Sequence, residues 1–129
     1  MHQLEKILYV EDDPDIREIA SMALEDVGGF TVKICESGEH ALQAVTEFQP
    51  QVVLLDVMMP GMDGPATLLA LKKVGAIADS VLVIFMTAKV HSEDVQRYKA
   101  LGVNEIIAKP FDSMTLADDI RAVWDAFNG

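Results

Sequence analysis

Short apolar runs alternate with amphipathic segments along the whole chain. Five runs of four to six residues are mostly apolar: Ile7–Val10, Thr31–Cys35, Val52–Leu55, Val81–Met86 and Glu105–Ala108. Their length is typical of strands, and most of them lack polar alternation. Such runs indicate strands buried on both faces, as in a parallel sheet.

The segments between these runs carry apolar residues at helical spacing. The predicted helices are Asp15–Val27, Glu39–Phe48, Pro65–Val74, Ser92–Leu101 and Ser113–Phe127. In the first helix, six residues would share the inward face: Ile16, Ile19, Ala20, Ala23, Leu24 and Val27. Because right-handed crossovers between parallel strands place helices on both faces of a sheet, we predict a doubly wound α/β fold. It would have a five-stranded parallel sheet, five helices and a single domain over residues 1–129.

The composition limits which partners the protein can bind and in which compartment it is expected. The chain has 129 residues, half of them hydrophobic, with 10 basic and 21 acidic side chains and a net charge of −11. This acidity argues against direct binding of nucleic acid, which needs a basic surface. Cys35 is the only cysteine, so no internal disulfide can form and a reducing compartment is expected. No signal peptide or membrane span is visible, and we expect a cytoplasmic protein.

Four of the five predicted strands are followed by side chains that can do chemistry. Glu11, Asp12 and Asp13 follow the first strand, and Asp56 follows the third. Thr87 follows the fourth strand and Lys109 the fifth. In doubly wound folds, ligands bind at the carboxyl ends of the strands, near the point where the strand order reverses. We therefore expect these groups to meet at one edge of the sheet.

The residue types suggest phosphoryl chemistry assisted by a cation. Asp12, Asp13 and Asp56 would form a carboxylate cluster suited to Mg²⁺, which prefers hard oxygen ligands. A carboxylate can also act as a nucleophile towards a phosphoryl group, and Asp56, fixed by the buried run VVLL, is the best candidate. Lys109 would supply a positive charge and Thr87 a hydroxyl, as phosphoryl transfer requires.

Each of these residues also has a simpler explanation. Asp13, Pro14 and Asp15 form a good helix start, with Asp13 as the N-cap. A single Asp after a strand, such as Asp56, is most often a turn residue. Thr87 can simply begin a loop, and Lys109 can be a solvated lysine. Their common position at one edge of the sheet favours a functional site.

These residues lie in motifs that resemble the receiver domains of two-component response regulators. The motifs are ILYVEDDPDIRE, VVLLDVMMPGMDG, VIFMTA and IIAKPF, in the family's order and at similar separations over essentially the whole chain. The resemblance implies a flavodoxin-like sheet of strand order 2-1-3-4-5. It also implies a cis peptide bond between Lys109 and Pro110.

The resemblance further implies a role for each site residue. Asp56 would accept a phosphoryl group from a histidine kinase or phosphotransfer protein. Asp12, Asp13, Asp56 and the backbone carbonyl of Met58 would hold Mg²⁺. Thr87 and Lys109 would contact the phosphoryl oxygens. The protein would catalyse only its own phosphorylation and dephosphorylation, act as a monomer or weak homodimer, and signal to a protein partner or to an output domain.

One departure and two alternatives stay open. The family often carries an aromatic switch residue three positions before the lysine, where this chain has Ile106. We hypothesise that the loop from Thr87 to Val90 and the following helix carry the signal instead. A receiver that binds partners without phosphorylation is one alternative. A small hydrolase or flavin carrier on the same fold is the other, although the acidic EDDPD loop would repel a phosphate group.

Overall fold

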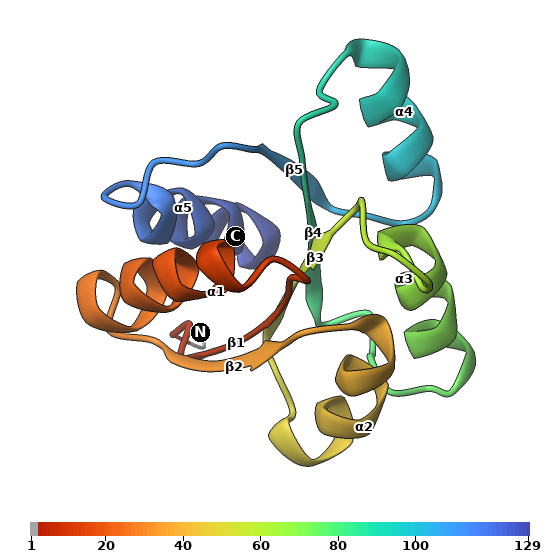
Figure 1. Ribbon diagram of the computed structural model, residues 1–129, viewed down its shortest axis with the longest axis horizontal. Coiled ribbons are helices and arrows are strands. Elements are labelled where there is room, and N and C mark those ends of the chain that lie inside the picture. Colours follow the sequence, from red (N-terminus) through yellow and green to blue (C-terminus); the bar gives the residue numbers. More distant parts are fainter. Residues whose placement is uncertain (1–2) are drawn as a thin grey trace.

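A five-stranded parallel sheet with helices on both faces organises the molecule (Figure 1). The computed structural model describes residues 3–129, so residues 1 and 2 of the predicted domain lie outside the described residues. The strands are β1 (Lys6–Val10), β2 (Thr31–Cys35), β3 (Val52–Asp56), β4 (Leu82–Thr87) and β5 (Glu105–Ala108). The helices are α1 (Pro14–Ser21), η1 (Met22–Val27), α2 (Gly38–Phe48), α3 (Gly64–Lys73), α4 (Ser92–Ala100) and α5 (Leu116–Asn128).

The strands lie in the order β2-β1-β3-β4-β5, and every neighbouring pair is parallel. This confirms the predicted fold class and strand order, with element boundaries within a few residues of those expected from the sequence. The strand order reverses between β1 and β3, because the chain leaves β1 for one edge of the sheet and later returns to add β3 on its other side.

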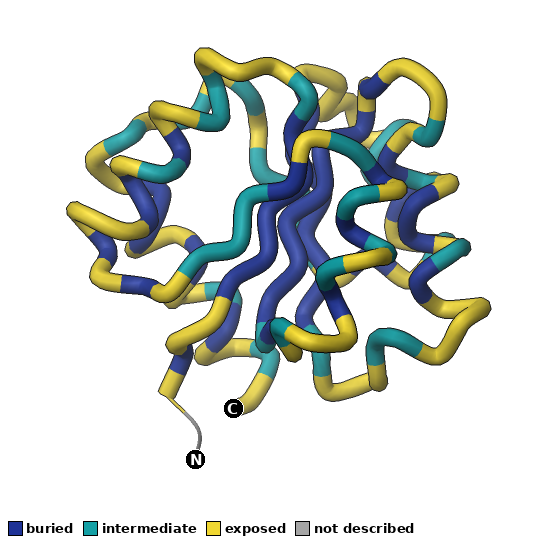
Figure 2. Tube along the Cα trace, turned by 60° about the horizontal axis from the view of Figure 1, so that its bottom comes forward, coloured by how far each residue is buried: buried dark blue, intermediate teal, exposed yellow. Residues whose placement is uncertain are grey.

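Two hydrophobic layers enclose the sheet, and α1 and α5 cover one face while α2, α3 and α4 cover the other (Figure 1). Alternate residues of strand β3 pack into the two layers. Val52 and Leu54 pack into the α1–α5 layer, whereas Val53 and Leu55 pack into the opposite one. Successive side chains of a strand point to opposite faces, so a strand buried on both faces must be apolar throughout. The central strands are accordingly buried along their length (Figure 2).

The first predicted helix differs from expectation in its second half. Its last six residues form the π-helix η1, in which the Gly28 amide donates to the Ala23 carbonyl five residues earlier. A π-turn inserts an extra residue into the helical repeat, so positions beyond it leave the 3.6-residue face. Val27, predicted to point inward, is therefore 44% exposed, and Ile19, at the margin of the apolar stripe, is 45% exposed.

The loop after β3 folds back tightly over the end of its strand. The Gly64 amide donates to the Val57 carbonyl, and a Cβ atom at Gly64 would lie 2.7 Å from the Asp56 carbonyl oxygen. Only glycine fits this close approach of two backbone segments. Gly64 therefore helps to hold Asp56 in a fixed position at the carboxyl edge of the sheet.

Candidate functional site

The groups predicted to meet do meet, at the carboxyl edge of the sheet. A hollow of about 260 Å³ is lined by Glu11, Asp12, Asp13, Ile16, Asp56, Met58, Thr87, Ala88 and Lys109. Glu11 and Asp12 follow β1, while Asp56 and Thr87 are the last residues of β3 and β4. Lys109 follows β5 and precedes Pro110 across a cis peptide bond, as expected. Four segments far apart in sequence thus contribute to one small site.

Lys109 joins two carboxylates in the site. Its ammonium lies 2.8 Å from Glu11 Oε1 and 3.3 Å from Asp56 Oδ1. Glu11 is 1% exposed and Asp56 is 4% exposed, so water screens neither charge well. The carboxylates therefore depend on Lys109, or on another cation, to offset the cost of their burial.

Burial and neighbouring charges shift the pKa values of all three groups. Burial, together with the hydrogen bond and charge of Glu11, raises the pKa of Asp56 to about 7, although Lys109 opposes the shift. Burial alone would raise the pKa of Glu11, but hydrogen bonds from its partners, chiefly Lys109, lower it below the ordinary value. Burial disfavours the Lys109 ammonium, yet Glu11 and Asp56 raise the pKa of Lys109 overall. Of Glu11 and Asp56, Asp56 is thus the carboxyl group whose charge is less well stabilised by its surroundings.

Asp13 lies at the rim of the hollow and caps α1. Its Oδ1 accepts hydrogen bonds from the backbone amides of Asp15 and Ile16, at 2.9 and 3.4 Å. Pro14 occupies the first turn, where its missing N–H costs nothing. The simpler explanation weighed for Asp13, helix capping, therefore describes its side chain in this structure.

Glu11, rather than Asp13, completes the cluster of carboxylates. Among residues 3–129, the acidic group that could hold a metal consists of Glu11, Asp12 and Asp56, with one oxygen from each lying within 4.8 Å of the others. The sequence did contain a signal for this. If Asp13 is the N-cap, the carboxylates left at the end of β1 are Glu11 and Asp12.

This donor set suits Mg²⁺. Hard carboxylate oxygens are its preferred protein ligands. With the three carboxylates of the cluster ionised and Lys109 protonated, the site carries two net negative charges, which one divalent cation would cancel. Bound there, Mg²⁺ would relieve the repulsion between Glu11, Asp12 and Asp56 and neutralise charge on a phosphoryl group.

Hydrogen bonds fix the surroundings of the cluster. The Arg17 guanidinium donates to the backbone carbonyls of Glu11 and Asp12, at 3.0 and 2.8 Å, and so ties the loop after β1 to helix α1. Thr87 is 2% exposed, and its hydroxyl accepts a hydrogen bond from the Lys89 amide at 3.0 Å. Thr87 therefore connects the site directly to the loop that leads into α4.

Tyr9 is a member of this network that the sequence did not suggest. Its hydroxyl donates to Glu11 Oε1 at 3.0 Å, and its side chain is fully buried. Burial and the neighbouring charge of Glu11 raise the pKa of Tyr9, so the hydroxyl keeps its proton and acts as a donor. The sequence pattern indicates only that Tyr9 belongs to an apolar strand.

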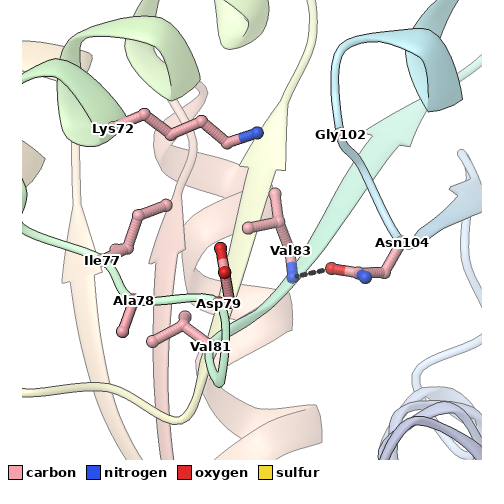
Figure 3. A pocket seen from close by; sticks show the side chains of 8 residues that line it. All are labelled: Lys72, Ile77, Ala78, Asp79, Val81, Val83, Gly102 and Asn104. Atoms are coloured by element: carbon pink, nitrogen blue, oxygen red, sulfur yellow. Dashed lines mark hydrogen bonds between the residues drawn. The ribbon is translucent and has the colours of Figure 1, made fainter.

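A larger hollow lies elsewhere on the surface. It measures about 480 Å³ and is lined by Lys72, Ile77, Ala78, Asp79, Val81, Val83, Gly102 and Asn104 (Figure 3). Here the Lys72 ammonium donates to the Leu101 carbonyl, and the Asn104 side chain accepts from the Val83 amide. These polar groups serve neighbouring backbone, and no cluster of buried charges forms among them.

Comparison with known proteins agrees with this geometry. The family model described as "Response regulator receiver domain" matches residues 7–121. The transcriptional regulatory protein CseB of Streptomyces avermitilis is 37% identical over 121 residues, covering 94% of this chain and 49% of that protein. The DNA-binding response regulator MtrA of Mycobacterium tuberculosis is 36% identical over 119 residues, covering 92% and 50%. The chain spans about half the length of these curated relatives.

Solved structures show the same fold. The chemotaxis response regulator CheY4 of Vibrio cholerae superposes with a TM-score of 0.84 at 28% identity, covering 94% of this chain and 99% of that one. The BeF3-activated receiver domain of DrrB gives 0.78 at 27% identity, covering 95% and 99%. No helix of residues 3–129 has both the length and the apolar character that crossing a bilayer requires. On the family match and these relatives, the chain belongs to the response-regulator receiver domains of two-component systems.

Proposed function

We propose that Asp56 is the phosphoacceptor of this receiver domain and that a phosphohistidine on a histidine kinase or phosphotransfer protein is the donor. The observation that carries the proposal is the position of Asp56: a buried carboxylate at the end of β3, 3.3 Å from Lys109 and beside Glu11 and Asp12. Phosphoryl transfer depends chiefly on positioning and charge stabilisation, and this site supplies both.

In the proposed reaction, a carboxylate oxygen of Asp56 forms a bond to phosphorus while the phosphorus–nitrogen bond of the donor breaks. The electron pair of that bond stays with the imidazole nitrogen, which takes up a proton. Lys109 would move its ammonium towards the phosphoryl oxygens, since it already lies between Glu11 and Asp56. Water later hydrolyses the aspartyl phosphate, so the protein acts on itself and not on a separate substrate.

For the metal ligands, we propose Glu11, Asp12 and Asp56, together with the Met58 backbone carbonyl. The mutual proximity of the three carboxylates supports the first part, and the place of Met58 in the lining of the hollow supports the second. Asp13, included in the ligand set on sequence grounds, is better assigned to capping α1 because its Oδ1 is engaged by two backbone amides.

Thr87 offers a route for the signal that needs no aromatic switch. Its hydroxyl holds the Lys89 amide, and thereby the start of the loop before α4. If the hydroxyl turned to donate to a phosphoryl oxygen, the Thr87–Lys89 contact would be remade and the loop could take a second arrangement. This extends the hypothesis that the loop from Thr87 to Val90 carries the signal past Ile106.

The output is proposed from the relatives. CseB is named as a transcriptional regulatory protein and MtrA as DNA-binding, and this chain matches about half of each. An output domain, or a separate protein partner, would read the phosphorylated state. The acidic receiver surface itself is an unsuitable surface for nucleic acid.

The test is the intact mass of the protein after incubation with acetyl phosphate, with Mg²⁺ and with excess chelator. The wild type should gain one phosphoryl group only with Mg²⁺, and Asp56→Asn should gain none. Asp79→Asn is the matched control, because Asp79 is an exposed aspartate in the other hollow, and it should be labelled like the wild type. Labelling of Asp56→Asn at the wild-type rate would refute the assignment, and no labelling of the wild type by acetyl phosphate or by a phosphorylated kinase would favour a phosphorylation-independent binding module.

A further inference from the structure

Tyr9 connects the hydrophobic core to the site through a single side chain. Its ring packs in the hydrophobic layer beneath α1 and α5, and it is fully buried. Its hydroxyl nevertheless reaches the carboxyl edge of the sheet and donates to Glu11 Oε1. The two side chains lie on the same side of the chain because they are two residues apart at the end of a strand.

The hydrogen bonds of Glu11 distinguish its two carboxylate oxygens. Oε1 accepts from both the Tyr9 hydroxyl, at 3.0 Å, and the Lys109 ammonium, at 2.8 Å. Among donors other than the Asp56 carboxyl group, Oε2 accepts from one, the Asp13 amide, through a long hydrogen bond of 3.3 Å. Oε2 therefore keeps more of its lone-pair capacity for a further ligand.

Lys109 alone is a poor anchor for Glu11, because it also contacts Asp56 at 3.3 Å. A flexible ammonium shared by two carboxylates can follow either of them. The Tyr9 hydroxyl has no such competing partner among the hydrogen bonds of the described residues, and its ring is held by close packing. Tyr9 is thus the rigid member of the pair of donors.

We propose that Tyr9 is a positioning residue for the metal site: its hydroxyl fixes the Glu11 carboxylate through Oε1 and leaves Oε2 free to bind the cation. This inference rests on the proposed function, in which Glu11 is a Mg²⁺ ligand. Partners that orient metal ligands typically contribute about 10- to 100-fold to metal affinity. Tyr9 would act through Glu11 and would not contact the phosphoryl group.

The first test is calorimetric titration of Mg²⁺ into the wild type, Tyr9→Phe and Tyr98→Phe. Tyr9→Phe keeps the ring and removes only the hydroxyl, and it should weaken Mg²⁺ binding about tenfold. Tyr98 is the only other tyrosine; it is also buried, but packs edge-on against Phe85 in the opposite layer. Tyr98→Phe should bind Mg²⁺ like the wild type, and urea unfolding should confirm that both variants are folded.

The second test is the Mg²⁺ dependence of labelling by acetyl phosphate. A positioning role predicts that Tyr9→Phe needs about tenfold more Mg²⁺ for its half-maximal rate but reaches the wild-type rate at saturation. A lower rate at saturation with an unchanged half-point would mean that the hydroxyl serves the fold or the reaction in another way, and the inference would fail.

The outcomes separate the inference from the proposal beneath it. If the wild type binds Mg²⁺ and Tyr9→Phe binds it equally well, Tyr9 has no positioning role and the proposed metal site stands. If the wild type itself binds no Mg²⁺, the metal site is wrong and the role of Tyr9 is overturned with it.

Discussion

The hollow at the carboxyl edge of the sheet and the larger hollow beside Lys72 differ in what their polar groups do. At the carboxyl edge of the sheet, Glu11 and Asp56 are buried charges that depend on Lys109. In the larger hollow, Lys72 and Asn104 bond to nearby backbone and lie largely open to water. The smaller hollow has the shifted pKa values and the convergent charges, which are the physical marks of a functional site. The larger volume of the other hollow is not accompanied by these marks.

The largest expected difference is in the free energy of unfolding when Lys109 in one hollow, or Lys72 in the other, is replaced. Lys109→Met leaves two buried carboxylates without their cation, and we expect the free energy of unfolding to fall by about 3 kcal/mol in the presence of chelator. Lys72→Met removes an exposed ammonium that holds one carbonyl, and the change should stay within about 0.5 kcal/mol. Urea unfolding at pH 7 measures both, and equal losses would remove the distinction between the hollows.

A second contrast concerns pH and the two aspartates, Asp56 and Asp79. The pKa of Asp56 rises from 3.8 to about 7 on folding, so the folded state binds a proton that the unfolded state releases between these values. The ionised carboxylate therefore costs stability, most at pH 8 and progressively less as the pH falls to 5. Asp56→Asn should raise the free energy of unfolding at pH 8 by about 2 kcal/mol, with a smaller gain at pH 5.

The measurement is chelator-treated urea unfolding at both pH values, with Asp79→Asn as the control. Because Asp79 is exposed, its substitution should show no such dependence on pH. A gain for Asp56→Asn that grew towards pH 5 would contradict the burial of a destabilising charge.

A smaller contrast lies within the site, between Glu11 and Asp13. Glu11→Gln should weaken Mg²⁺ binding by more than the roughly tenfold expected for Tyr9→Phe, because it removes a charged ligand and not a partner that orients one. Asp13→Asn should have much less effect, since asparagine caps a helix as well as aspartate does. Calorimetric titration compares the two, and the opposite ranking would restore Asp13 to the ligand set.

The smallest expected effect concerns two methionines, Met58 and Met114, that are each 65% exposed. Met58 lines the hollow beside Asp56, whereas Met114 does not. If the Met58 side chain hinders water at the phosphoryl group, Met58→Asn should shorten the life of the phosphorylated protein severalfold. Met114→Asn should leave it unchanged. Mass spectrometry at timed intervals measures the loss of the phosphoryl group. Equal lifetimes of the wild type and Met58→Asn would refute the proposal that the Met58 side chain hinders hydrolysis.

Most of the fold could be predicted from local pattern. The run VVLL is apolar throughout because side chains of β3 pack into both core layers. An unbroken apolar run of this length predicts such a strand from the sequence alone. The π-helix η1 could not be predicted from the sequence. The apolar residues that precede it keep the ordinary helical spacing, so nothing in the pattern indicates an extra residue in the next turn. The helical spacing therefore predicts that Val27 points inward, whereas Val27 is exposed.

The site was predicted in its location and less completely in its membership. Asp56, Thr87 and Lys109 end or follow strands, so their meeting at one edge follows from the topology. The topology does not decide which of the carboxylates of Glu11, Asp12 and Asp13 join the cluster. Adjacent residues point in different directions, and the start of α1 decides which one becomes the cap. The role of Tyr9 could not be predicted, because a tyrosine in an apolar run is expected to be a core residue. Only the hydrogen bond from its hydroxyl to Glu11 distinguishes it.

By itself, the sequence determined the strands, the helices and the edge at which the charged residues gather. These follow from periodicity and from the rule that parallel strands end on the same side. Only the tertiary structure decided that Glu11 is buried beside Lys109 and shares its ammonium with Asp56. The reason is physical: hydrogen bonds and desolvation depend on distances between residues up to 98 positions apart, which no local pattern encodes.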